Sequence, residues 1–157
     1  MANYYFETSA FLKRYKQEKG SNFVNQLIED SSSSIFYLNL TIAEVSKVFF
    51  RLYKYPQGLE KDKQISKEVF ESLQNQFAHD LLKMNKISLT EEIIEKAKNI
   101  LEKCYLKSVV DLLHLSAFLI TKEEFPDIKL VTSDEEIVRA AGKLVSKSII
   151  INPEDYE

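Results

Sequence analysis

The first predicted strand and helix are encoded by NYYFETSAFLKRY, residues 3–15. Asn3 to Phe6 is short, aromatic and prone to form a strand, and Thr8 or Ser9 can cap the helix that follows. A single acid, Glu7, separates the two elements. Because α/β proteins place their ligand sites where strands give way to helices, Glu7 is the first candidate site residue.

The same order of strand and helix returns along the rest of the chain. Thr41 is expected to cap a helix that carries Glu44 at the capping-box position, and Ser108 to cap a very apolar helix over residues 109–120. The alternation predicts an α/β fold with a parallel sheet. After Pro153 the end of the chain is expected to fray. The further strands are expected at residues 35–40, 86–89, 128–132 and 148–151.

The composition suits one globular domain without a strong electrostatic affinity for nucleic acid. The chain has 157 residues, of which 45% are hydrophobic and 29% charged, and its formal net charge is −3. One domain spanning residues 1–157 is therefore expected. The negative charge argues against passive, tight binding of RNA, but not against an enzyme that reaches phosphates through a metal ion.

Cysteine usage and the absence of targeting signals predict a cytoplasmic protein. Cys104 is the only cysteine, so neither an internal disulfide nor a zinc site of several thiols can form, which fits a reducing compartment. Met1 to Tyr4 lack the basic region and the long apolar run of a signal peptide. No apolar run reaches the length of a membrane span, so no contact with a membrane is expected.

Four acidic residues stand at the junctions between strands and helices. Glu7 follows the first strand and Asp134 the strand over residues 128–132, while Glu44 and Asp111 fall in the first turns of helices. In an open parallel sheet, the carboxyl ends of the strands form the ligand site. Each acid alone could be a helix cap or a partner of the helix dipole. Taken together, the four predict one acidic cluster.

A cluster of carboxylates needs a cation. Like charges brought together are unfavourable and raise one another's pKa values. Carboxylate oxygens are hard ligands that select Mg²⁺, Mn²⁺ or Ca²⁺ over Zn²⁺, and a metal so held can polarise a phosphate and activate water. The sequence therefore predicts a magnesium site, with manganese as the other candidate ion, formed by Glu7, Glu44, Asp111 and Asp134.

Basic side chains flank the acidic segments and are candidates to hold RNA phosphates beside the metal, although they could equally be ordinary solvated cations. His114 lies three residues after Asp111 and is expected to be a buried hydrogen-bonding residue, because a metal-activated water needs no histidine base. The candidate RNA-binding residues are Lys13, Arg14, Lys47, Arg51 and Lys107.

Three other classes of phosphate or nucleotide site are excluded by residues that the chain lacks. A haloacid-type phosphatase needs a second aspartate two residues after the first acid, where this chain has Ser9. A phosphate-binding loop needs a glycine-rich segment ending in Gly-Lys-Ser or Gly-Lys-Thr, and a Rossmann site needs a glycine fingerprint after the first strand. The chain has three glycines and neither motif.

Four segments, in order and spacing, resemble the motifs of the PIN-domain family, and within it the VapC-type toxins. The resemblance extends from about residue 4 to residue 154. Each motif alone is weak, whereas four in the right order are specific. The segments are FETSAFLKRY (6–15), TIAEV (41–45), LKSVVDLLHLSA (106–117) and LVTSD (130–134), followed by INP (151–153).

The resemblance implies a three-layer α/β/α fold with a parallel five-stranded sheet in the order 3-2-1-4-5. It implies a magnesium-dependent endoribonuclease that cuts structured RNA, often transfer RNA or ribosomal RNA. It also implies a cognate antitoxin protein as inhibitor and assembly as a homodimer. The four acids above occupy the acidic positions of the four motifs.

The chain departs from the family pattern at the first acid. Glu7 stands where the family has aspartate, so the carboxylate lies one methylene further from the backbone. Lys107 replaces the usual arginine and loses its planar fork for phosphate, and Leu112 replaces the usual alanine. Because magnesium demands near-ideal geometry, Glu7 keeps open an alternative, a catalytically weak PIN protein that acts as an RNA- or protein-binding module.

Aromatic content suggests a further surface. The chain has ten Phe and eight Tyr, and amphipathic helices are expected near residues 42–53 and 65–82. We expect a homodimer together with a groove for an antitoxin helix. The alternative is that these aromatic side chains simply fill the core.

Overall fold

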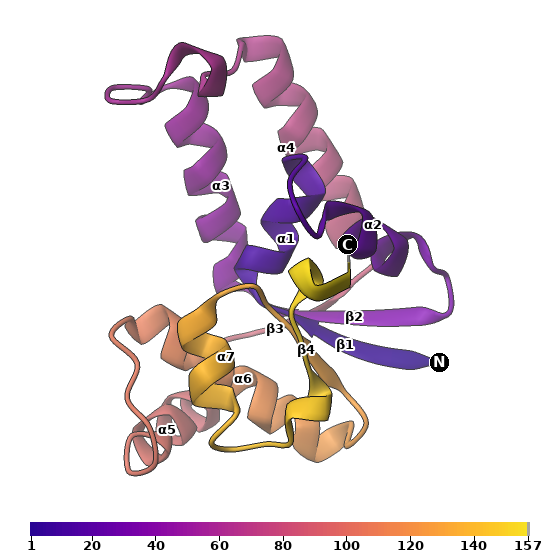
Figure 1. The fold of residues 1–157 in the computed structure, drawn as a ribbon, viewed down its shortest axis with the longest axis vertical. Coiled ribbons are helices and arrows are strands. Elements are labelled where there is room, and N and C mark those ends of the chain that lie inside the picture. The colour runs from indigo at the N-terminus through magenta and orange to yellow at the C-terminus, as the bar shows by residue number, and fades with distance from the viewer. Residues whose placement is uncertain (157) are drawn as a thin grey trace.

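The computed structural model describes residues 1–156 and contains a sheet of five parallel strands (Figure 1). The strand order is β3-β2-β1-β4-β5, so the expected α/β class and the order implied by the family resemblance are both confirmed. The first strand lies in the centre, with β2 and β4 as its neighbours. The strands are β1 (Ala2–Phe6), β2 (Ser33–Leu38), β3 (Asn85–Ile87), β4 (Lys129–Val131) and β5 (Ile150–Ile151).

Helices cover both faces of the sheet and complete three layers (Figure 1). The helices α5, α6 and α7 lie on one face, and α1, α2, α3 and α4 on the other. The α-helices are α1 (Thr8–Tyr15), α2 (Ser21–Glu29), α3 (Leu40–Tyr53), α4 (Lys67–Leu81), α5 (Glu91–Ile100), α6 (Val109–Glu124) and α7 (Glu135–Ala141). Short 3-10 helices are η1 (Lys61–Lys63), η2 (Lys147–Ile149) and η3 (Pro153–Tyr156).

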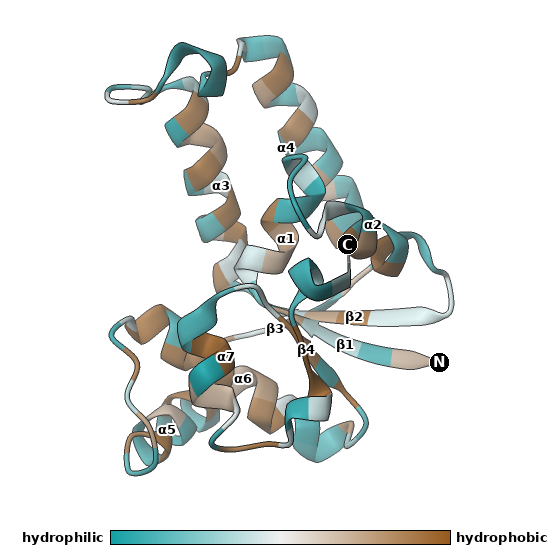
Figure 2. Ribbon diagram, in the orientation of Figure 1, coloured by the Kyte–Doolittle hydropathy of each residue, from teal (hydrophilic) through white to brown (hydrophobic). Residues whose placement is uncertain are grey.

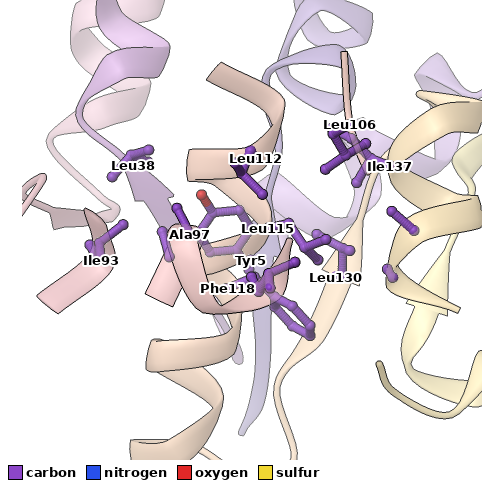
Figure 3. Packing of buried hydrophobic residues seen from close by; sticks show 14 of the residues in the cluster. Tyr5, Leu38, Ile93, Ala97, Leu106, Leu112, Leu115, Phe118, Leu130 and Ile137 are labelled. Carbon is purple, nitrogen blue, oxygen red and sulfur yellow. The ribbon is translucent and has the colours of Figure 1, made fainter. Parts of the chain in front are cut away.

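Alternation along β1 divides the core into two clusters. Tyr5 and Phe6 are both fully buried, and because successive side chains of a strand point to opposite faces, each belongs to a different cluster. Tyr5 packs with Leu115 and Phe118 of α6 (Figure 3). Phe6 packs edge-to-face on Phe11 of α1, with ring centroids 5.5 Å apart. The central strand thus joins both helical layers.

The pair α3 and α4 extends beyond the sheet (Figure 1), and hydrophobic and hydrophilic residues alternate along both helices (Figure 2). Their contact is aromatic, with Tyr53 stacked on Phe70 at 4.8 Å between ring centroids. Most phenylalanines fill the core, so the aromatic content gives less support to a dimer than the sequence suggests, and the homodimer stays a prediction. The buried phenylalanines are Phe6, Phe11, Phe36, Phe49, Phe70, Phe77 and Phe118.

Helix caps agree with the sequence in part. Ser108 caps α6, as predicted, by accepting a hydrogen bond from the Asp111 amide. The predicted cap of α1 is wrong, because the carboxylate of Glu7 accepts from the Ser9 amide and occupies the capping position itself. The capping box at Glu44 is wrong as well. The helix α3 already begins at Leu40, so Thr41 lies inside it.

The segment after β5 is held in place instead of frayed. Glu154 in η3 forms an ion pair with Lys13, at 2.8 Å between Nζ and Oε1, and Tyr156 stacks on Phe23 at 4.3 Å between ring centroids. The prediction that the chain frays is therefore wrong for Pro153–Tyr156. The prediction also covered Glu157, which lies outside the described residues. In residues 1–156, none of the helices is long and apolar enough to cross a membrane.

Candidate functional site

The carboxyl ends of β1 and β4 lie side by side and bring two of the candidate acids together. The amide of Glu7 donates a hydrogen bond of 3.0 Å to the carbonyl oxygen of Val131, the last residue of β4. Asp134 follows three residues later, at the start of α7. Thus the topology brings together residues that are 127 positions apart in the sequence.

Glu7 is nearly buried, with 3% of its surface exposed. Its Oε2 accepts hydrogen bonds from the Ser9 amide at 3.0 Å, from the Ser9 hydroxyl, and from the Thr132 hydroxyl at 2.8 Å. Its Oε1 has no hydrogen-bond donor among residues 1–156. One oxygen therefore ties β1, α1 and the loop after β4 together, and the other remains available to a ligand.

Only one oxygen of the Asp134 carboxylate accepts hydrogen bonds from the described residues. Its Oδ1 accepts from the amides of Glu136 at 2.9 Å and Ile137 at 3.1 Å, which caps α7. The Asp134 amide donates to the Thr132 hydroxyl at 3.1 Å. Thr132 is fully buried and therefore links the two acids, since its hydroxyl donates to Glu7 and accepts from Asp134.

Glu44 belongs to a buried hydrogen-bond network. It lies on α3, and its Oε1 is 2.6 Å from Nε2 of His114 and 2.8 Å from the hydroxyl of Thr8. Burial raises the pKa of Glu44, but the hydrogen bonds and charge of its neighbours outweigh this and hold the pKa below its ordinary value. The chief neighbours are His114, then Thr8 and Lys47. Glu44 is therefore ionised well below neutral pH.

Asp111 lies in the first turn of α6 and is half-buried. Burial, followed by the negative charges of Asp134 and Glu7, raises its pKa to about 6, with a smaller raising effect from Glu44 and a lowering effect from His114. Interactions between charges are strong enough to shift a pKa in this way only over short distances. The electrostatic interactions of Asp111 therefore join all four predicted acids, which come from four different elements, into one acidic cluster.

The acidic cluster fits a hard divalent cation in its chemistry. It offers carboxylate oxygens from several elements, and burial, followed by the negative charges of neighbouring acids, raises the pKa of Asp111. In residues 1–156, however, no group of three or more His, Cys, Asp or Glu side chains is arranged to hold a metal ion. Coordination of one ion by three of these acids therefore requires some of the side chains to move. If fewer acids bind the ion directly, water molecules complete its coordination shell.

Two of the predicted RNA-binding residues have other partners. Lys13 is buried, with 3% of its surface exposed, and its ammonium group contacts Glu18, Glu154 and the carbonyl oxygen of Lys19. Arg14 forms ion pairs with Asp80 at 3.2 Å and Glu29 at 2.8 Å. These contacts, with a further one from Arg14 to Asn25, use the three N–H donors of Lys13 and most of those of Arg14. As placed, Lys13 and Arg14 hold the fold together, and the prediction that they contact RNA is not retained.

The other three predicted RNA-binding residues are exposed. Lys47 lies one turn after Glu44 on α3 and is close enough to lower the pKa of that acid. Arg51 lies one turn further, and its guanidinium donates to the carbonyl oxygens of Tyr55 and Gln57. Lys107 is exposed just before α6. Lys47 therefore has the most direct connection to the acidic cluster.

Sequence reasoning missed the polar residues that hold the acids. Thr8 and Ser9 were interpreted as helix caps, but they are hydrogen-bond donors to Glu44 and Glu7. Thr132 and Tyr5 were interpreted only as strand residues. Their sequence signal is weak, namely a hydroxyl within two residues of an acid at the end of a strand.

Comparison with solved structures shows the same fold in other proteins. The crystal structure of VapBC2 from Rickettsia felis, bound to a DNA fragment from their promoter, contains a chain with 17% identity and a TM-score of 0.56, covering 96% of this chain and 98% of that one. A toxin-antitoxin complex from Klebsiella pneumoniae contains one with 16% identity and a TM-score of 0.56, covering 98% of both chains. FitAcB from Neisseria gonorrhoeae contains one with 13% identity and a TM-score of 0.58, covering 96% of this chain and 97% of that one.

The sequence itself supplies the family. No curated protein matches it. The family model of the PIN domain matches residues 4–143, which include all four acids of the acidic cluster and the strands that position them. The match covers most of the chain, and the strand order agrees with the expectation for that fold. The chain therefore belongs to the PIN domain family.

Proposed function

We propose that this protein is a metal-dependent endoribonuclease and the toxin of a toxin–antitoxin pair. One observation carries the proposal: Asp111 has its pKa raised to about 6 by burial and by the charges of acids from three other elements. Such crowding of acids is costly in a folded protein unless a cation relieves it. Perturbed carboxyl groups of this kind gather at functional sites.

Asp111 and Glu44 are the proposed principal ligands of Mg²⁺ or Mn²⁺. Asp134 would bind the ion directly or through water, and Glu7 would contribute its Oε1. When bound, the ion supplies charge neutralisation for the phosphate and lowers the pKa of a water molecule. The residues of the chain position these oxygens, and Lys47, Arg51 and Lys107 are proposed to hold the phosphates of RNA nearby.

The proposed attack by water predicts which ends the cleaved RNA should carry. Attack by water on the phosphorus, with the 3′ oxygen as leaving group, leaves a 5′-phosphate and a 3′-hydroxyl. Structured RNA, such as transfer RNA or ribosomal RNA, is the proposed substrate class. One of the similar folds supports the toxin assignment, because the Klebsiella pneumoniae structure is a toxin-antitoxin complex by name.

An antitoxin protein is the proposed partner, acting in the cytoplasm. A groove lined by Leu12, Val48 and Leu52 runs between α1 and α3 and includes Glu44 and Lys47. An amphipathic antitoxin helix could bury its apolar side chains in this groove and cover the acidic cluster. We also propose that the toxin forms a homodimer, for which light scattering at micromolar concentration should give twice the mass of one chain.

Cleavage of defined RNAs tests the proposal. The purified chain, free of antitoxin, is incubated with transfer RNA and ribosomal RNA in Mg²⁺ or in excess chelator, beside Asp111→Asn and a control, Asp62→Asn, which makes the same change at an exposed acid. We expect cleavage in Mg²⁺ by the wild type and the control only. Cleavage that survives both Asp111→Asn and chelator would refute the acidic-cluster mechanism, and a 2′,3′-cyclic phosphate would refute attack by water. A folded chain that binds RNA or protein but cuts no RNA would support the alternative of a binding module.

A further inference from the structure

A fully buried histidine contacts Glu44 and is not among the proposed metal ligands. His114 on α6 has none of its surface exposed. Its Nδ1 is 3.0 Å from the hydroxyl of Tyr5, and its Nε2 is 2.6 Å from Oε1 of Glu44. The imidazole therefore bridges the central strand β1 and the helix α3, at the edge of the acidic cluster.

Donor and acceptor counting assigns each proton in this network. The ionised carboxylate of Glu44 can only accept, so Nε2 of His114 must donate to its Oε1. In a neutral imidazole Nδ1 is then the acceptor, so the hydroxyl of Tyr5 donates to it. The hydroxyl of Thr8 also donates to Oε1 and is therefore left to accept, at 3.1 Å, from the hydroxyl of Thr41. Nε2 of His114 also lies 3.2 Å from the hydroxyl of Thr8, so this hydroxyl is a second, more distant acceptor for the proton that Nε2 donates to Glu44 at 2.6 Å.

The network acts on one oxygen of Glu44 only. Both His114 and Thr8 donate to Oε1, whereas Oε2 has no hydrogen-bond donor among the described residues. Because Oε1 is held by two donors from separate elements, the carboxylate cannot rotate freely about its last bond. Tyr5 is fixed in turn, since its ring packs edge-to-face against Phe118 at 5.9 Å and lies among the α6 side chains Leu112 and Leu115 (Figure 3).

We propose that His114 is a positioning residue, held by Glu44 and Tyr5 in the tautomer with the proton on Nε2, and that it fixes Oε1 of Glu44 so that Oε2 is presented to the metal. The part that concerns the metal rests on the proposed function. Partners of this kind orient metal ligands in proteins, and their loss typically weakens metal affinity by about 10- to 100-fold.

Histidine nitrogen spectroscopy tests the tautomer without metal or RNA. The chain has two histidines, and the exposed His79 serves as an internal reference. In the metal-free protein labelled with ¹⁵N-histidine, at pH 7.5, His114 should show a protonated Nε2 and an unprotonated Nδ1. Tyr5→Phe should change the nitrogen chemical shift of the unprotonated Nδ1, because it removes the hydrogen bond to that atom. Tyr37→Phe should leave this shift unchanged, since it removes a buried tyrosine hydroxyl that belongs to the other core cluster. A proton on Nδ1 of His114 in the wild type would overturn the assignment.

Affinity for Mn²⁺, measured by electron paramagnetic resonance of the free ion, tests the positioning. We expect His114→Leu to weaken binding by about 10- to 100-fold, and His114→Gln, which keeps an N–H donor near the Nε2 position, to restore most of it. Tyr5→Phe should weaken binding by about 2- to 10-fold, as loss of one hydrogen bond does, and Tyr37→Phe should leave it unchanged. Circular dichroism verifies folding.

The outcomes separate the two proposals. Unchanged Mn²⁺ affinity in folded His114→Leu would overturn the positioning role. If that variant does not fold, the comparison of Tyr5→Phe with Tyr37→Phe decides, and equal affinities of the two would overturn it. A wild-type chain that binds Mn²⁺ and gives the expected order of variants, but leaves RNA intact, would overturn the proposed function alone. A wild-type chain that binds no Mn²⁺ would overturn both.

Discussion

Replacement of Asp111 by asparagine should stabilise the metal-free protein, although it removes a proposed ligand. The folded state raises the pKa of Asp111 from its ordinary value of 3.8 to about 6. The folded chain therefore holds this proton more tightly than the unfolded chain, and ionisation of Asp111 opposes folding. Asparagine has nearly the same shape and no charge, so the variant avoids this cost.

Two opposing contributions determine how much the variant gains in unfolding free energy. A shift of about two pKa units corresponds to about 3 kcal/mol of opposing free energy at neutral pH. Because Asp111 is only half-buried, solvent screening reduces this to about 1–2 kcal/mol. The variant also loses the favourable interaction of a negative charge with the first turn of α6, about 0.5 kcal/mol. We expect a net gain in unfolding free energy of about 1 kcal/mol above pH 6, fading as the pH falls to about 4.

Urea unfolding in excess chelator, at pH 7.5 and at pH 4, measures this gain. The control is Asp62→Asn, because Asp62 is exposed in η1, away from the acidic cluster. Asp111→Asn should raise the urea midpoint at pH 7.5 and not at pH 4, and the control should change neither. An Asp111→Asn variant that is less stable than the wild type at pH 7.5, or whose gain persists unchanged at pH 4, would refute the inference that ionisation of Asp111 opposes folding.

Three further predictions concern the same site and its support. Mg²⁺ at ten times its dissociation constant should raise the unfolding free energy of the wild type by about 1.4 kcal/mol; the increase should be absent in Asp111→Asn, and an equal increase in both would place the ion elsewhere. Glu7→Asp should raise Mg²⁺-dependent cleavage of RNA, because it shortens the side chain to the family's usual length, and Glu7→Ala should abolish cleavage; cleavage that is indifferent to both changes would remove Glu7 from the site. Lys13→Met should lower the unfolding free energy by about 1.5–3 kcal/mol, because it removes hydrogen bonds of a buried ammonium group. Lys16→Met, at an exposed lysine, is the control, and equal urea midpoints for the two variants would contradict the structural role of Lys13.

The sequence predicted the class of the fold correctly, and it indicated four candidate acids, because both inferences depend on local patterns. Strand and helix segments follow apolar periodicity, and an acid at the end of a strand can be recognised from a few neighbours. The strand order came only from the family resemblance, since no local pattern shows which strands pair. The prediction of one domain over residues 1–157 stays a prediction.

The errors arose where partners lie far apart in sequence. Lys13 looks like a surface lysine in its own segment, and only the return of Glu154, 141 residues later, shows that it is buried. The pairing of Arg14 with Asp80 spans 66 residues in the same way. The sequence left open whether Glu7 caps a helix, and it gave no sign that the oxygen of Glu7 that caps α1 also contacts Thr132. Side-chain hydrogen bonds of this kind depend on tertiary contacts that a single sequence does not reveal.

The central position of β1 has a consequence for the timing of synthesis. Tyr4 pairs with Lys129, 125 residues further along the chain, so β1 leaves the ribosome long before its neighbour β4. At ordinary translation rates this interval is roughly 6 to 25 s. During this interval Glu7 lacks its hydrogen bond from Thr132, because neither Thr132 nor Asp134 has yet been made. A nascent or truncated chain that ends before Asp134 therefore cannot assemble the acidic cluster, and any RNA-cutting activity would have to wait until Asp134 has been made.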